Sequence, residues 1–260
     1  MKTVQRLLGF WTVLVMIFFY LPIAILIGYS FNTSRLNIVW EGFTLDWYAA
    51  IWRDRVLVAS LYNSLYVAVV TTVLSVVLGT GGAWLLFRYR FPGVRLLNTL
   101  VFIPMIIPEV IMGVSLLIFF VAVQLELGYA TIIISHVTFC FPFVMVAVQA
   151  RLAGLDPSLE EAAQDLGATP FQAFRKILVP YLAPAIISGA LMSFTLSLDE
   201  LIVTYFTASA GTRTLPLEIF GRVKKGLDPT LNAISTVFIL STVVLVVATE
   251  LLKKRENREG

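Results

Sequence analysis

Charged residues are scarce in this chain of 260 residues, and their scarcity identifies its solvent. Only 13% of the residues are Asp, Glu, Lys or Arg, 58% are hydrophobic, and the mean hydropathy is +0.89. An ordinary soluble domain carries about 25% charged residues. The composition therefore excludes a soluble globular protein and predicts an integral membrane protein surrounded by lipid.

Cysteine, histidine and nucleotide-binding motifs are also nearly or wholly missing. The single cysteine, Cys140, excludes an intrachain disulfide. His136 lies one helical turn before it, but two ligands are too few for a metal site, so we expect packing there and no metal. The glycines 79, 81 and 82 lack the Lys of a phosphate-binding loop, so they predict close helix packing and no ATP hydrolysis by this chain.

Long apolar runs predict an all-α fold with six transmembrane helices in a single domain, 1–260. A helix needs about 20 mostly apolar residues to cross the hydrocarbon core. The first run follows Lys2 and Arg6 like a signal peptide, but it is too long and lacks a cleavage site, so we expect a retained anchor. The expected spans are 8–29, 62–87, 97–123, 129–150, 181–207 and 233–252.

The distribution of basic residues predicts the orientation. With the N-terminus inside, the inner segments hold 12 Lys and Arg and the outer ones 7. The positive-inside rule therefore favours a multi-pass protein of the inner (plasma) membrane with both termini in the cytoplasm.

The inner loop 151–180 carries the strongest local signals. Ser158 and Glu161 form a capping box for one short helix, and Gly167 can end that helix in the left-handed conformation. Thr169 and Gln172 repeat the start signal for a second helix. The loop therefore predicts a helix–turn–helix at the membrane surface.

This loop resembles the signature of ABC importer permeases, E-A-A-x3-G-x9-I-x-L-P, with Val179 in place of the usual Leu. The resemblance implies a type I ABC importer permease fold, whose cytoplasmic coupling helix fits a cleft on a separate ATPase that holds ATP and Mg²⁺. The alternative is a surface helix that only links two spans. The matching residues are Glu161, Ala162, Ala163, Gly167, Ile177 and Pro180.

Three carboxylates interrupt the apolar spans: Glu109, Asp199 and Glu200. A charge at this depth costs about 2.5–3.5 kcal/mol, so such residues normally face a cavity or a partner. No Lys or Arg lies within these spans, which favours a cationic cargo; the alternative is pairing with another subunit. Pro104 and Pro108 predict a broken helix just before Glu109.

Span 181–207 also carries a stripe of polar residues at helical spacing. Neighbouring residues on a helix diverge by about 100°, so Asp199 and Glu200 point in different directions and the sequence does not decide which one faces the pathway. The stripe consists of Ser193, Ser197, Glu200, Thr204 and Thr207.

Most of the chain is similar to spermidine/putrescine importer permeases, specifically the second permease subunit. This resemblance implies a heterodimer with a sister permease, two ATPase subunits, a periplasmic or extracellular polyamine-binding protein, surrounding lipid, and no nucleic acid. Glu109 stands where relatives often have Asp. The matching stretches are 30–32, 34–35, 42–44, 47–48, 135–140, 142–143, 193–199 and 215–217.

Aromatic residues in the first outer loop are either an interfacial belt or a surface for a partner and a cation. Because ammonium groups and methylenes suit carboxylates and aromatic faces, we expect Trp47 to contact a polyamine at the outer mouth. The expected pathway is Trp47, Glu109, Asp199 and Glu200. One alternative is an ABC importer permease for another small cationic or amine solute. The other is a cation channel or ion-coupled transporter, but a protein of that class would have no use for an ATPase-docking loop.

Overall fold

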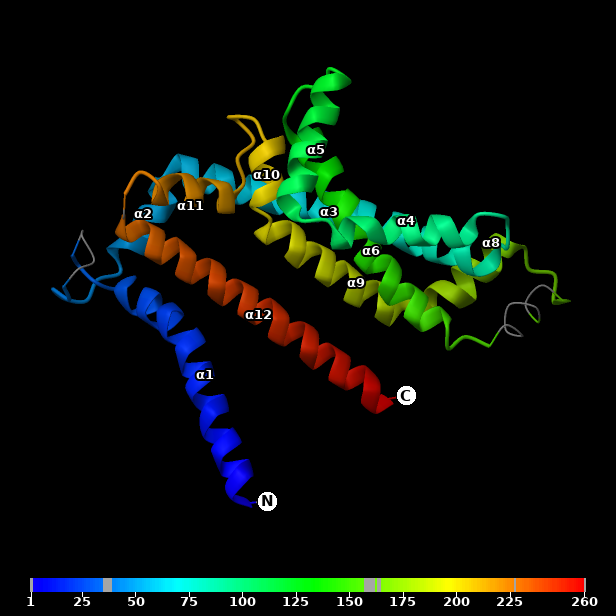
Figure 1. Cartoon of the computed structure of the whole chain (residues 1–260), viewed down its shortest axis with the longest axis horizontal. Helices are drawn as coiled ribbons and strands as arrows, with labels where there is room; N and C mark the ends of the chain where they lie inside the picture. Colours follow the sequence, from blue (N-terminus) through cyan, green and yellow to red (C-terminus); the bar gives the residue numbers. More distant parts are fainter. Residues whose placement is uncertain (1, 35–38, 157–161, 163–164, 227, 260) are drawn as a thin grey trace. The chain divides into compact units, whose positions relative to one another are not determined.

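The computed structural model describes residues 2–34, 39–156, 162, 165–226 and 228–259, and helices account for nearly all of its regular structure. A π-helical turn, Phe174–Leu178, separates α8 from α9. The α-helices are α1 (Lys2–Tyr29), α2 (Asp46–Arg53), α3 (Arg55–Arg88), α4 (Val94–Ile106), α5 (Glu109–Ala122), α6 (Tyr129–Leu152), α8 (Pro170–Ala173), α9 (Val179–Asp199), α10 (Ile202–Thr207), α11 (Leu215–Val223) and α12 (Pro229–Glu259) (Figure 1).

Apolar length supports several membrane spans within the described part of the chain. Four helical stretches are long and apolar enough: Val4–Tyr29, Arg55–Arg88, Tyr129–Leu152 and Pro170–Asp199. The pair α4 and α5, bent by 109°, gives a fifth if it counts as one broken span. The apolar part of α12 is shorter, at Pro229–Val244, so the expected total of six stays a prediction.

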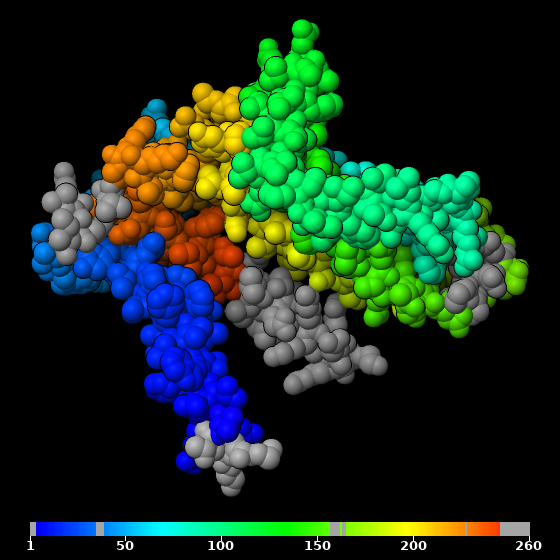
Figure 2. Space-filling model, in the orientation of Figure 1, coloured from blue at the N-terminus to red at the C-terminus, as the bar shows by residue number. Residues whose placement is uncertain are grey.

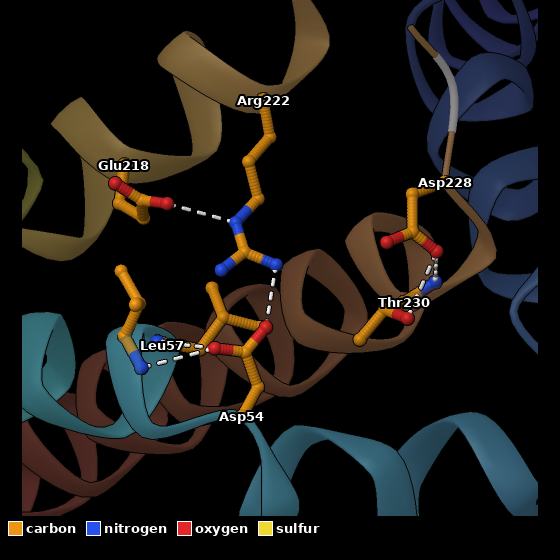
Figure 3. A network of polar contacts seen from close by, with 7 residues as sticks. Asp54, Leu57, Glu218, Arg222, Asp228 and Thr230 are labelled. Atoms are coloured by element: carbon orange, nitrogen blue, oxygen red, sulfur yellow. Dashed lines mark hydrogen bonds and ion pairs between the residues drawn. The ribbon is translucent and has the colours of Figure 1, made fainter. Parts of the chain in front are cut away.

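The chain divides into two compact units. The first unit joins the chain up to Ala59 with Glu218–Leu245, and the second consists mainly of Ser60–Leu217. In the first unit, Arg222 of α11 bonds Asp54, which precedes α3, at 2.7 Å, and Glu218 at 2.8 Å (Figure 3). Asp54 also accepts the backbone N–H groups of Val56 and Leu57, so one carboxylate both begins α3 and holds α11.

The second unit is built around α6, which lies along α9 (Figure 1). Its main core cluster contains Val144, Met145 and Val148 of α6 with Leu182 of α9. Gly79 of α3 meets this core so closely that an added Cβ would lie 2.7 Å from Val144 Cβ and 2.8 Å from the carbonyl oxygen of Phe141. The packing role predicted for the glycines is confirmed at Gly79, whereas Gly81 has nothing within 4 Å.

The helices α4 and α5 lie on the surface of the second unit (Figure 2). None of the α4 residues is buried. Large apolar side chains such as Ile106 and Ile118 are 81% and 63% exposed. Surfaces of this kind are stable against lipid or another apolar chain.

Candidate functional site

Two helix breaks position the intramembrane acids. The first lies between α4 and α5, where Ile107 and Pro108 are extended and Glu109 begins α5. Pro108 has no N–H to continue the α4 ladder, so the break predicted from the prolines is confirmed. A carboxylate in the first turn also complements the positive end of the helix dipole of α5.

The second break interrupts the span that the sequence predicted as one continuous helix, 181–207. Helix α9 ends at Asp199, and α10 starts at Ile202. The Glu200 carboxylate accepts the Val203 N–H at 2.7 Å. In an unbroken helix this N–H would bond the carbonyl of Asp199, so the Glu200 side chain replaces a backbone bond and begins a new helix.

The two breaks meet because α5 packs along α10. Gly113 makes this possible, since an added Cβ would lie 2.6 Å from the Phe206 ring. Glu109 begins α5 and Glu200 precedes α10, so these two acids lie at the starts of two helices that pack together. Asp199 is exposed, whereas Glu200 is only 8% exposed, and none of the three acids pairs with a Lys or Arg in the described part of the chain.

Trp47 belongs to the first unit, whereas the three acids belong to the second. Its indole Nε1 donates to the backbone oxygen of Asn32 at 2.7 Å, and the Asn32 side chain bonds Val39 and Glu41 in turn. Trp47 is therefore half-buried and helps to fold its own loop. Its expected contact with a polyamine stays a prediction, as does the choice between a lipid belt and a partner surface.

The polar stripe of the second unit faces α6 and is buried. Ser193, Ser197, Thr204 and Thr207 are at most 2% exposed. His136 bonds Ser197 Oγ and Thr204 Oγ1, both at 2.8 Å, and Thr131 Oγ1 donates to the backbone oxygen of Thr207 at 2.7 Å.

Cys140 packs beside this network, with its Sγ 3.6 Å from the backbone oxygen of Ser193. His136 and Cys140 thus contact hydroxyls and backbone. Sequence reasoning recognised the stripe by its spacing but not its partner, because His136 is 61 residues from Ser197 and 68 from Thr204.

The loop 151–180 shows part of the expected helix–turn–helix. Thr169 and Gln172 form the predicted capping box, with bonds of 2.9 and 3.3 Å, and Gly167 adopts the left-handed conformation with φ of 88°. Ser158, Glu161 and Ala163 lie outside the described residues. The described Ala162 is helical and exposed.

Apolar side chains that the sequence analysis did not single out project from this turn. Leu166 is 90% exposed and Phe171 is 66% exposed. Ile177 is half-buried in the π-helical turn, and Pro180 lies in the first turn of α9. The neighbouring Leu178 is buried in the main core, so the loop is joined directly to the membrane helices.

Comparison with known proteins identifies the family. The model of the family "binding-protein-dependent transport system inner membrane component" matches residues 72–258. The chain belongs to this family. It is 39% identical over 241 residues to the spermidine/putrescine transport system permease protein PotC of Escherichia coli K12, covering 93% of this chain and 91% of PotC.

A second relative and a solved structure extend this comparison. It is 41% identical over 252 residues to the putrescine transport system permease protein PotI of E. coli K12, covering 94% of this chain and 87% of PotI. A solved bacterial alginate ABC transporter, in complex with a periplasmic protein bound to an alginate pentasaccharide, matches with a TM-score of 0.72 and 17% identity over 98% of this chain and 96% of the other. At that identity the likeness shows the fold, so the ABC importer permease fold expected from the sequence is confirmed.

Proposed function

We propose that this permease carries polyamines, spermidine or putrescine, through the inner membrane into the cytoplasm. The observation that supports this cargo most directly is that three carboxylates, Glu109, Asp199 and Glu200, lie at two helix breaks joined by the packing of α5 on α10, without a basic partner in the described residues. PotC and PotI, which share 39% and 41% of their aligned residues with the chain, are named as permeases for such amines.

The physical chemistry of the breaks favours a cation. The C-terminal ends of α4 and α9 present backbone carbonyls and the negative end of the helix dipole close to the acids. Discontinuous helices of this kind line cation sites in other transporters. An ammonium group that enters would neutralise carboxylates whose charge is otherwise costly in the membrane.

The assembly that we propose contains a sister permease, two ATPase subunits and an external polyamine-binding protein. ATP and Mg²⁺ bind the ATPases, and both termini of this chain face the cytoplasm. The exposed Leu166 and Phe171 beside the capped turn support docking of the loop to an ATPase, because such side chains are stabilised by burial in a partner. Residues Glu161, Ala162, Ala163, Gly167, Ile177 and Pro180 would form or support the coupling helix.

Uptake of radiolabelled putrescine and spermidine by the reconstituted complex tests the cargo. We expect Glu109→Gln to raise the KM for putrescine and spermidine roughly tenfold or more, because the substitution removes a negative charge that binds the ammonium group. The ATPase should stay bound. Glu126→Gln is the matched control, since Glu126 is exposed in the loop between α5 and α6. Unchanged uptake kinetics in Glu109→Gln would show that this residue is not part of the pathway. If the purified chain retained no ATPase subunit, a channel would be favoured over an importer.

A further inference from the structure

The only histidine of the chain is buried where α9 breaks. His136 is fully buried on α6, and its two ring nitrogens bond hydroxyls on either side of the break. Nδ1 lies 2.8 Å from Ser197 Oγ in the last turn of α9, and Nε2 lies 2.8 Å from Thr204 Oγ1 in α10. One ring therefore links both halves of the broken helix to α6.

The hydrogen bonds of Thr204 determine which ring nitrogen carries the proton. The Thr204 hydroxyl has one hydrogen, and the backbone oxygen of Glu200, 3.0 Å from Thr204 Oγ1, can only accept it, whereas the histidine ring can donate a hydrogen of its own. With the Thr204 hydrogen on the Glu200 oxygen, Thr204 Oγ1 accepts from His136, an arrangement that places the ring proton on Nε2 and satisfies all three groups.

Burial fixes the state of the other nitrogen. A fully buried imidazolium without a carboxylate against it would be costly, so the ring is neutral and Nδ1 accepts from Ser197. The result is one directed series of hydrogen bonds, from Ser197 to His136 to Thr204 to the backbone of Glu200.

We propose that His136 is a positioning residue, held as the neutral Nε2–H tautomer, that fixes the break between α9 and α10 and thereby orients Glu200. Glu200 is held from two sides: its backbone oxygen accepts from Thr204, and its carboxylate accepts from Val203 N–H. The bond from Thr131 to Thr207 attaches the far end of α10 to the same helix, α6. The effect on transport rests on the proposed polyamine pathway, whereas the tautomer does not.

Nitrogen-15 NMR on the complete complex, with labelled histidine, tests the tautomer. Because this chain has one histidine, the signals that vanish in the His136→Asn complex belong to His136. We expect one protonated nitrogen, assigned to Nε2, and one unprotonated nitrogen, and we expect Thr204→Val to alter this pattern. Thr138→Val is the control, since Thr138 is half-buried on the same helix and its hydroxyl donates only to the backbone oxygen of Ile134, one turn earlier. An Nδ1–H tautomer, a doubly protonated ring or rapid exchange between tautomers would overturn the assignment.

Uptake kinetics of two amide variants, His136→Asn and His136→Gln, test the positioning role. The amide of His136→Asn reaches the place of Nδ1 and loses Thr204, whereas the amide of His136→Gln reaches the place of Nε2 and can still donate to Thr204. At equal amounts in the membrane, we expect His136→Asn to raise the KM for putrescine roughly fivefold, the size of one lost hydrogen bond, and His136→Gln to recover most of that loss.

The two experiments separate this inference from the proposed function. Equal KM values in wild type, His136→Asn and His136→Gln, or equal losses in both variants, would overturn the positioning role. A wild-type complex that takes up another amine with the same order among the variants would refute the polyamine cargo but support the role of His136.

Discussion

Two polar networks hold the chain together with different chemistry. The charged network, Asp54, Arg222 and Glu218, lies in the first unit, where the three side chains are 29%, 21% and 10% exposed (Figure 3). The neutral network, His136, Ser197 and Thr204, lies in the second unit and is at most 2% exposed. Both bridge segments that are far apart in the sequence.

The difference in exposure explains the difference in chemistry. Water that reaches the charged network lowers the desolvation cost of its ions, so a guanidinium between two carboxylates is stable there. The neutral network has no such contact, and hydroxyls with a neutral imidazole satisfy one another without burying a charge. In the second unit, close packing at two glycines supplies the remaining attachment: Gly79 lies against Val144 and the backbone of Phe141, and Gly113 lies against the Phe206 ring.

The largest effect should follow from disrupting this close contact. Gly79→Val would force side-chain atoms against Val144 and the backbone of Phe141, which cannot move aside, and we expect a loss of about 3 kcal/mol or more. Folded chain extracted from the membrane should fall to a small fraction of wild type, as measured by fluorescence-detected size exclusion. Gly81→Val makes the same chemical change on the same helix with nothing within 4 Å, so equal losses in both variants would contradict the packing argument.

The same contrast shows what the sequence could predict. Local signals predicted local features: Pro108 the first break, Thr169 and Gln172 the capping box, and Gly167 the left-handed turn. The second break contains no proline or glycine that could signal it, since the Glu200 carboxylate itself replaces the backbone hydrogen bond there. No local pattern distinguishes such a carboxylate from one that faces a pathway.

Long-range contacts were beyond the reach of the sequence for a related reason. The bond from Trp47 to Asn32 and the bonds of His136 depend on how separate helices and loops meet. The predicted pathway residues therefore divide between the two units: the acids come together at the breaks, and Trp47 serves its own loop.

A smaller effect should follow from removing the central ion of the charged network. Arg222→Met leaves Asp54 and Glu218 without their shared partner, which should cost about 1–3 kcal/mol. The thermal midpoint of the purified complex should fall by roughly 3–8 °C. Lys225→Met removes the same charge from an exposed position on the same segment and should leave the midpoint nearly unchanged. If both variants behave alike, net charge rather than the network sets the stability.

The smallest effect concerns pH, and it separates the two networks most cleanly. The hydrogen bond from Arg222 holds the pKa of Asp54 below its ordinary value of 3.8, against the opposing effect of burial. Because the folded-state pKa is lowered, the stabilisation is complete above the unfolded pKa and is lost as pH falls through the folded pKa. The thermal midpoint of wild type should therefore exceed that of Asp54→Asn by about 1–3 °C, and this difference should be constant from pH 7 to about pH 5. Below about pH 4 the difference should shrink. The midpoint of Thr204→Val should not converge with that of wild type at low pH, since its network contains no carboxylate side chain. If the midpoints of Asp54→Asn and Thr204→Val depended on pH in the same way, the division into charged and neutral networks would be contradicted.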